Sequence, residues 1–314
     1  MIEASNLGRR YGSLEAVKGV SFAVNPGEVV GLLGPNGAGK TTIMKILTCY
    51  LFPTYGTATL NGYDIFENPL EIKRSVGYLP ENAPLYTDLN VLEYLEFLSE
   101  ARSLKSPTRQ ERIEWAIEEC GLQSVVYRSI ETISKGFRQR TGLAQAILHD
   151  PEILILDEPT TGLDPNQIIE IRELIKRLGE EKTVILSTHI LQEVEATCGR
   201  VLILNEGQIV AKGTPEEINR EMKGEVLLEL VLKGAGKPAG VAGVPGVREL
   251  LRSSKLGQER YQIELSLLPD SSAEEAVFDW AVASGYKILA MVPKRVSLEE
   301  LFIRLTREGA SDVH

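Results

Sequence analysis

The chain has 314 residues, of which 43% are hydrophobic and 25% charged, an ordinary globular composition with room for about two domains. A formal net charge of −10 argues against a nucleic-acid-binding protein, which presents a basic face. Three widely spaced cysteines, no run of about 18 apolar residues and no basic-then-apolar signal at residues 1–6 lead us to expect a cytoplasmic protein without a membrane span of its own.

Residues 2–24 predict short strands around a turn at Gly12. The most informative segment of the chain comes after them. Apolar residues 29–33 predict a buried strand, and residues 42–47 predict a helix. The segment between them fits G-x-x-x-x-G-K-[ST] and reads Gly34-Pro35-Asn36-Gly37-Ala38-Gly39-Lys40-Thr41. Strand, loop and helix together predict a phosphate-binding loop.

Each part of this loop has a physical role. Its glycines let backbone N–H groups point at phosphate oxygens, and the helix N-terminus adds positive potential. Lys40 would bridge the β- and γ-phosphates, and the Thr41 hydroxyl would hold Mg²⁺. We expect the loop, extended to Thr42, to bind a nucleoside triphosphate; the alternative is a glycine-rich turn that binds nothing.

Beyond the loop, strand and helix patterns alternate. Residues 57–60 and 76–79 are short strand candidates, whereas the apolar spacing in residues 85–149 predicts a mostly helical insertion. Fully apolar strand candidates return at 153–156, 183–187 and 201–204. Short apolar strands that alternate with helices are typical of a parallel sheet buried on both faces, so we expect an α/β fold.

The pattern changes near residue 222, which separates two predicted domains, 1–222 and 223–314. In the second, we expect strands at 225–232, 261–267 and 287–292, with a helix at 273–284. Ser297 would cap a last helix whose apolar face carries Leu298, Leu301, Phe302 and Leu305. These elements predict a small α+β domain.

Two adjacent carboxylates, Asp157 and Glu158, end the apolar strand candidate 153–156. Ligands of open α/β sheets bind at the C-terminal edge of the strands, where these residues stand. Asp157 would orient Mg²⁺ through water. Glu158 would point the other way in an extended chain and polarise a water that attacks the γ-phosphate. The alternative is a surface Asp-Glu pair that merely ends a strand.

Further motifs follow the phosphate loop in a fixed order. They are Ile133-Ser134-Lys135-Gly136-Phe137, Leu156-Asp157-Glu158-Pro159-Thr160, Gly162-Leu163-Asp164-Pro165 and Ser187-Thr188-His189. In this order they resemble the ATPase subunit of an ABC transporter, over about residues 1–218. The resemblance implies a P-loop NTPase core with a mixed sheet and a helical subdomain at 85–149, followed by the accessory domain. It also implies ATP hydrolysis with Mg²⁺.

The resemblance assigns roles to residues outside the phosphate loop. Tyr11 would stack on adenine, and His189 would hydrogen-bond the γ-phosphate. Ser134 and Gly136 would contact the ATP held by a second copy, and Asp164 would join the two sites. The unit would then be a head-to-tail pair, either a homodimer or a heterodimer with a paralogous ATPase, with two ATPs at its seam.

Two positions depart from the family pattern. Glu81 stands where the family usually carries Gln; we expect it to contact Mg²⁺, with an added negative charge near the γ-phosphate. Lys135 replaces a glycine of the signature and would either lie near the partner's phosphate or point to solvent. Both variations resemble the exporter branch that includes gliding-motility, drug-export and polysaccharide-export ATPases.

The resemblance therefore predicts an exporter ATPase that drives a separate transmembrane permease. The ATPase would bind this permease and so lie at the inner face of the cell membrane. One alternative is a soluble ABC ATPase acting on ribosomes or DNA, which the acidic charge and single ATPase unit disfavour. Another is a regulator that transmits a signal rather than moving cargo, because fold alone does not fix function.

Overall fold

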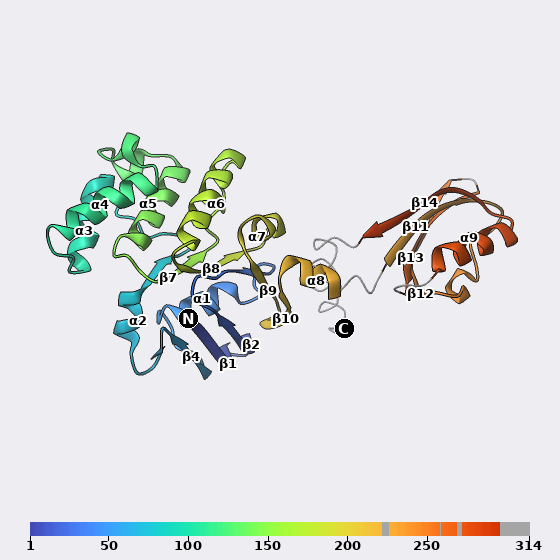
Figure 1. Cartoon of the computed structure of the whole chain (residues 1–314), viewed down its shortest axis with the longest axis horizontal. Helices are drawn as coiled ribbons and strands as arrows, with labels where there is room; N and C mark the ends of the chain where they lie inside the picture. Colours follow the sequence, from blue (N-terminus) through green and yellow to red (C-terminus); the bar gives the residue numbers. More distant parts are fainter. Residues whose placement is uncertain (222–225, 258, 269–271, 296–314) are drawn as a thin grey trace. The chain divides into compact units, whose positions relative to one another are not determined.

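The computed structural model describes residues 1–221, 226–257, 259–268 and 272–295 (Figure 1). They form two compact units, Met1–Pro215 and a second that begins at Glu216. Within the described part of the chain, no helix is long and apolar enough to cross a bilayer.

The first unit begins with a small antiparallel sheet in the order β2-β1-β4-β5. Its strands are β1 (Ile2–Tyr11), β2 (Leu14–Val24), β4 (Tyr55–Leu60) and β5 (Tyr63–Asp64). The turn between β1 and β2 places Gly12 at φ +60°, a conformation that glycine adopts without steric cost. Ile2 and Leu7 point from β1 into a core that also contains Met44, so this sheet packs over the helix that follows the phosphate loop.

A six-stranded sheet, ordered β10-β9-β3-β8-β7-β6, forms the centre of the first unit. Its strands are β3 (Val29–Leu33), β6 (Val76–Leu79), β7 (Ile153–Asp157), β8 (Thr183–Thr188), β9 (Arg200–Asn205) and β10 (Gln208–Gly213). All neighbours are parallel except the edge strand β10. Every residue of β7 and β8 is buried, which explains their continuous apolar runs. The predicted α/β class is confirmed.

Helices surround this sheet (Figure 1). They are α1 (Lys40–Leu47), α2 (Pro69–Ser75), α6 (Pro165–Gly179) and α7 (Leu191–Thr197). A further helix, α8 (Pro215–Glu221), begins at the boundary between the two units. The Asp164 carboxylate caps α6 by accepting from the backbone N–H groups of Asn166 and Gln167.

The helical region contains α3 (Val91–Ala101), α4 (Thr108–Glu119) and α5 (Lys135–Ile147), with single 3-10 turns at Gln123–Val125 and Ile130–Thr132. Asn90 and Glu93 form a reciprocal capping box at the start of α3. The helix α5 packs directly on β6, where a Cβ added to Gly77 would fall 2.1 Å from the carbonyl oxygen of Ala146. A glycine at this position therefore permits the close approach.

The second unit has a four-stranded antiparallel sheet in the order β12-β13-β11-β14. Its elements are β11 (Val226–Lys233), β12 (Val247–Gly257), β13 (Arg260–Leu267), α9 (Ala273–Ala283) and β14 (Lys287–Arg295), with a 3-10 turn at Val241–Gly243. Leu228, Leu230 and Ile263 of the sheet share a core with Val277 of α9.

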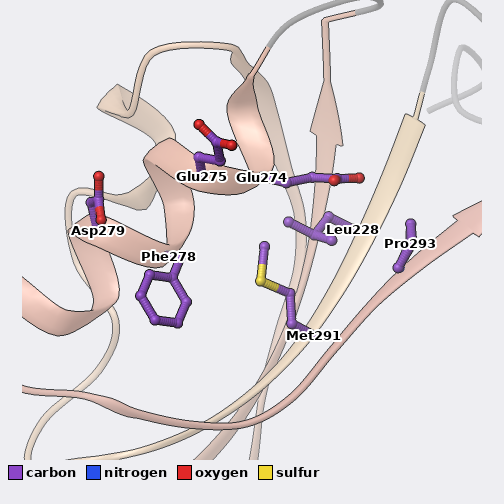
Figure 2. A pocket seen from close by; sticks show the side chains of 7 residues that line it. All are labelled: Leu228, Glu274, Glu275, Phe278, Asp279, Met291 and Pro293. Atoms are coloured by element: carbon purple, nitrogen blue, oxygen red, sulfur yellow. The ribbon is translucent and has the colours of Figure 1, made fainter.

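A cavity of about 560 Å³ lies beside that core. Figure 2 shows α9 on one side, with Glu274 and Phe278, and the sheet residues Leu228 and Met291 on the other. Sequence patterning missed β12, because its side chains are mostly exposed or half-buried and no apolar alternation marks the strand. The helix predicted from Ser297 lies outside the described residues.

Candidate nucleotide site

The phosphate loop connects the end of β3 to the start of α1. Gly37 and Gly39 adopt φ values of +83° and +104°, which favour glycine. A Cβ on Gly34 would fall 2.5 Å from the carbonyl oxygen of Leu204, and one on Gly39 would be as close to that of Ala16. These glycines are therefore required both for the curl of the loop and for its close approach to neighbouring backbone.

Lys40, the first residue of α1, folds back over this loop. Its buried ammonium donates to the carbonyl oxygens of Gly34 at 2.8 Å and Pro35 at 3.2 Å. It also lies 3.3 Å from Oε1 of Glu158, which is equally buried. The structure thus joins the loop lysine to the second carboxylate of the β7 terminus.

Asp157 ends β7 with a fully buried side chain. Its Oδ1 accepts from Ser187 Oγ at 2.5 Å and from Thr41 Oγ1 at 3.2 Å. Burial raises the pKa of Asp157, while these two hydrogen bonds oppose that shift. Its Oδ2 is buried without a hydrogen-bond partner among the described residues. A free carboxylate oxygen beside the Thr41 hydroxyl is a donor set that suits Mg²⁺.

Glu158 leaves the strand rather than continuing it. We predicted an extended residue, but its φ is +50°, and this detail was wrong. Its backbone N–H donates to both Oγ and the carbonyl oxygen of Ser187, and Thr161 N–H donates to its carbonyl oxygen at 3.2 Å. These bonds hold the left-handed turn that brings the carboxylate over the loop.

His189 follows β8 and meets the same carboxylate. Its Nδ1 lies 2.8 Å from Glu158 Oε2, which also accepts from the Thr161 hydroxyl at 3.2 Å. The imidazole remains 43% exposed. Glu158 therefore stands between a buried cation and a half-exposed histidine, an arrangement that can hold and orient a polar reactant.

A cavity of about 460 Å³ opens above the loop. The predicted site residues that line it are Tyr11, Asn36, Gly37, Gly39, Lys40, Thr41, Thr42, Glu81, Glu158 and His189. Tyr11 is 44% exposed, and the centroid of its ring lies 5.0 Å from Cζ of the Arg9 guanidinium. Leu14, Ala16 and Thr161 also line the cavity. Sequence reasoning missed these three, because no motif marks them.

The signature residues lie elsewhere. The Ser134 hydroxyl caps α5 by accepting from Phe137 N–H at 3.3 Å, and Gly136 packs so tightly that an added Cβ would fall 2.6 Å from Gln167. The Lys135 ammonium lies against Gly162. None of the described residues that line the phosphate-loop cavity comes from this segment.

His149 lies just after α5 and is half-buried, with Nε2 3.2 Å from the carbonyl oxygen of Val76. The three cysteines are free and buried, and burial raises the pKa of Cys49 to about 11. Buried thiols of this kind are inert.

Comparisons with known proteins agree with this geometry. A family model described as ABC transporter matches residues 17–161. The linearmycin resistance ATP-binding protein LnrL of Bacillus subtilis is 32% identical over 99% of this chain and 100% of its own length. The ABC transporter ATP-binding protein NatA of the same organism is 35% identical over 72% of this chain and 95% of its own.

Solved structures show the same relationship. An ATP-binding subunit of an ABC transporter is 32% identical, with a TM-score of 0.65 over 71% of this chain and 93% of that one. A dimeric cassette, MJ0796, bound to ADP and Pi in a post-hydrolysis state, is 25% identical, with a TM-score of 0.63 over 68% of this chain and 98% of that one. The chain therefore belongs to the ABC transporter ATP-binding proteins, a family of ATPases.

Proposed function

We propose that this protein is the ATP-hydrolysing subunit of an ABC exporter and that it drives a separate transmembrane permease. The single observation that carries the hydrolytic part is the Glu158 carboxylate, held between Lys40 at 3.3 Å and His189 at 2.8 Å over the phosphate loop. An in-line attack on a γ-phosphate needs such a positioned acceptor for the water proton.

We assign separate roles in hydrolysis to the residues of the site. The loop N–H groups and Lys40 would hold the phosphates, with Tyr11 stacked on adenine. Thr41, Asp157 and Glu81 would hold Mg²⁺, which supplies charge neutralisation at the phosphates when bound. Glu158 would then accept hydrogen bonds from His189 and from the attacking water. The buried Oδ2 of Asp157 has no hydrogen-bond partner within the described part of the chain, which supports the metal assignment because a bound cation would satisfy this oxygen.

We further propose that two copies, or one copy and a paralogous ATPase, close around ATP. Ser134 and Gly136 would reach the nucleotide of the partner, and Asp164 would lie at the seam. Their place away from this chain's own cavity supports a role in trans, and the related cassette MJ0796 is dimeric. ATP would favour the closed pair because it binds that form better, and hydrolysis would release it.

The exporter assignment rests on relatives. LnrL is named for linearmycin resistance. The YbhF protein of Escherichia coli, 37% identical over 70% of this chain and 38% of its own length, is named a probable multidrug ABC transporter ATP-binding protein. By this proposal the protein lies at the inner face of the cell membrane through its permease, with the C-terminal unit as an accessory domain.

Affinity purification tests the coupling. Glu158→Gln should retain ATP and trap the closed pair, so we would purify it with Mg-ATP from detergent-solubilised native membranes and identify partners by mass spectrometry. Lys40→Ala, which should lose ATP, is the matched control. A stoichiometric polytopic permease with Glu158→Gln supports the exporter. Soluble partners alone, such as ribosomal proteins, would move the assignment to a soluble or regulatory ABC ATPase.

A further inference from the structure

The loops that carry Glu158 and His189 converge on one buried carboxylate that sequence reasoning did not single out. Glu193, in the first turns of α7, is 3% exposed. Its Oε1 accepts from the Thr160 hydroxyl at 2.6 Å, and its Oε2 accepts from the Thr188 hydroxyl at 2.6 Å. Both bonds are short and charge-assisted, which makes them stronger than ordinary neutral hydrogen bonds.

The two threonines stand next to the proposed hydrolytic residues. Thr160 lies two positions after Glu158, within the turn that leaves β7, and Thr188 directly precedes His189 at the end of β8. The Thr188 hydroxyl also accepts from the backbone N–H of Ile190 at 3.0 Å. The Thr188 hydroxyl thus links the Glu193 carboxylate, to which it donates, to the backbone N–H of the residue after His189.

Among the described residues, the Glu193 carboxylate has one ion pair, in which Nη2 of Arg172 in α6 lies 3.8 Å from Oε1. A buried carboxylate in such a setting adds little net stability compared with an apolar side chain of similar volume. The carboxylate does constrain the geometry, because a hydroxyl from the turn after β7 and a hydroxyl from the end of β8 bind its two oxygens at once.

We propose that Glu193 is a positioning residue for ATP hydrolysis. It fixes the loop of Glu158 against the loop of His189, with Thr160 and Thr188 as its two anchors, and thereby sets the 2.8 Å contact between the proposed base and the histidine. This inference rests on the proposed roles of Glu158 and His189. A displacement of a reacting group by about 1 Å typically costs about 100-fold in rate.

The test separates positioning from stability. A triple variant, Thr160→Val, Thr188→Val and Glu193→Leu, removes the polar cluster but keeps volume, so it should fold as well as the parent. The matched control, Thr160→Ser with Thr188→Ser, keeps both hydroxyls. We would measure melting temperature, ATP affinity and the kcat and KM of ATP hydrolysis in the full-length protein.

We expect the triple variant to lose at least about tenfold in kcat with its melting temperature and ATP affinity preserved, whereas the serine variant keeps the parental kcat. A triple variant with parental kcat would overturn the proposal. If the triple variant fails to fold, the single variant Thr160→Val carries the test, because it removes the bond to the Glu158 loop while Glu193 keeps its bond to Thr188. Glu158→Gln is measured in parallel: if it retains full turnover, the proposed base is wrong, which is a different failure from an unchanged kcat in the triple variant alone.

Discussion

Replacing Ser187 with alanine tests how the β7 terminus is held. The Ser187 hydroxyl donates to Asp157 at 2.5 Å and accepts from the backbone N–H of Glu158 at 3.0 Å. A hydrogen bond to a charged group contributes about 2 kcal/mol to the free energy of unfolding. Without the Ser187 hydroxyl, the buried Asp157 carboxylate keeps, among the described residues, only the longer hydrogen bond from Thr41. We expect the first unit to melt about 4–8 °C lower.

The pH dependence of this loss follows from the Asp157 carboxyl. The Ser187 bond lowers its pKa against the effect of burial, so Ser187→Ala raises that pKa further in the folded state. The extra instability is therefore fully present above the folded pKa and fades as the pH falls through it. Calorimetry of the full-length protein at pH 7.5 and at acidic pH measures the difference.

An Asp157→Asn background supplies the control. The amide still accepts a hydrogen bond but carries no charge, so the cost of Ser187→Ala should fall by about 1 kcal/mol, the difference between charged and neutral bonds. A cost that is identical with Asp or Asn at position 157, and independent of pH, would refute the reasoning.

Three further changes have defined outcomes. Burial lowers the pKa of His149 to about 4, so the folded protein keeps this imidazole neutral while the unfolded chain takes up a proton. The free energy of unfolding of the parent, measured by urea titration, should therefore fall by about 2 kcal/mol between pH 7.5 and 5 through this group, and His149→Gln should not show that part of the fall. Equal falls in the two proteins would contradict this. Tyr11→Ala should weaken ATP binding about tenfold in calorimetric titrations, whereas Tyr11→Phe should not. Gly77→Ala should lower the free energy of unfolding by about 1–3 kcal/mol, because the added methyl group would meet α5. In the same urea titrations Gly199→Ala should leave it unchanged, because a methyl group at position 199 would meet open space.

Sequence patterning predicted the elements whose signal is local. The phosphate loop is identified by the spacing of its glycines and Lys40, and the strands β7 and β8 by continuous apolar runs, because both of their faces are buried. The place of Asp157 at the end of β7 follows from the same pattern, since the run ends where the strand does.

Other features depend on contacts that are distant in sequence. The left-handed turn at Glu158 is held by Ser187, 29 positions away, and Glu193 meets Thr160 over 33 positions. No spacing rule connects these residues, so the orientation of the proposed base and its anchors required three-dimensional structure. The exposed strand β12 was missed for a different reason, because it carries no apolar alternation.

The most direct test of the account is ATP turnover by Glu158→Gln, measured beside ATP affinity. The amide keeps the shape of the side chain but cannot accept a proton, so we expect hydrolysis to fall by about 10²–10⁴-fold while ATP binding is retained. Lys40→Ala should instead lose binding itself. Parental turnover by Glu158→Gln would show that the carboxylate between Lys40 and His189 is not the base, and the proposed mechanism would be wrong.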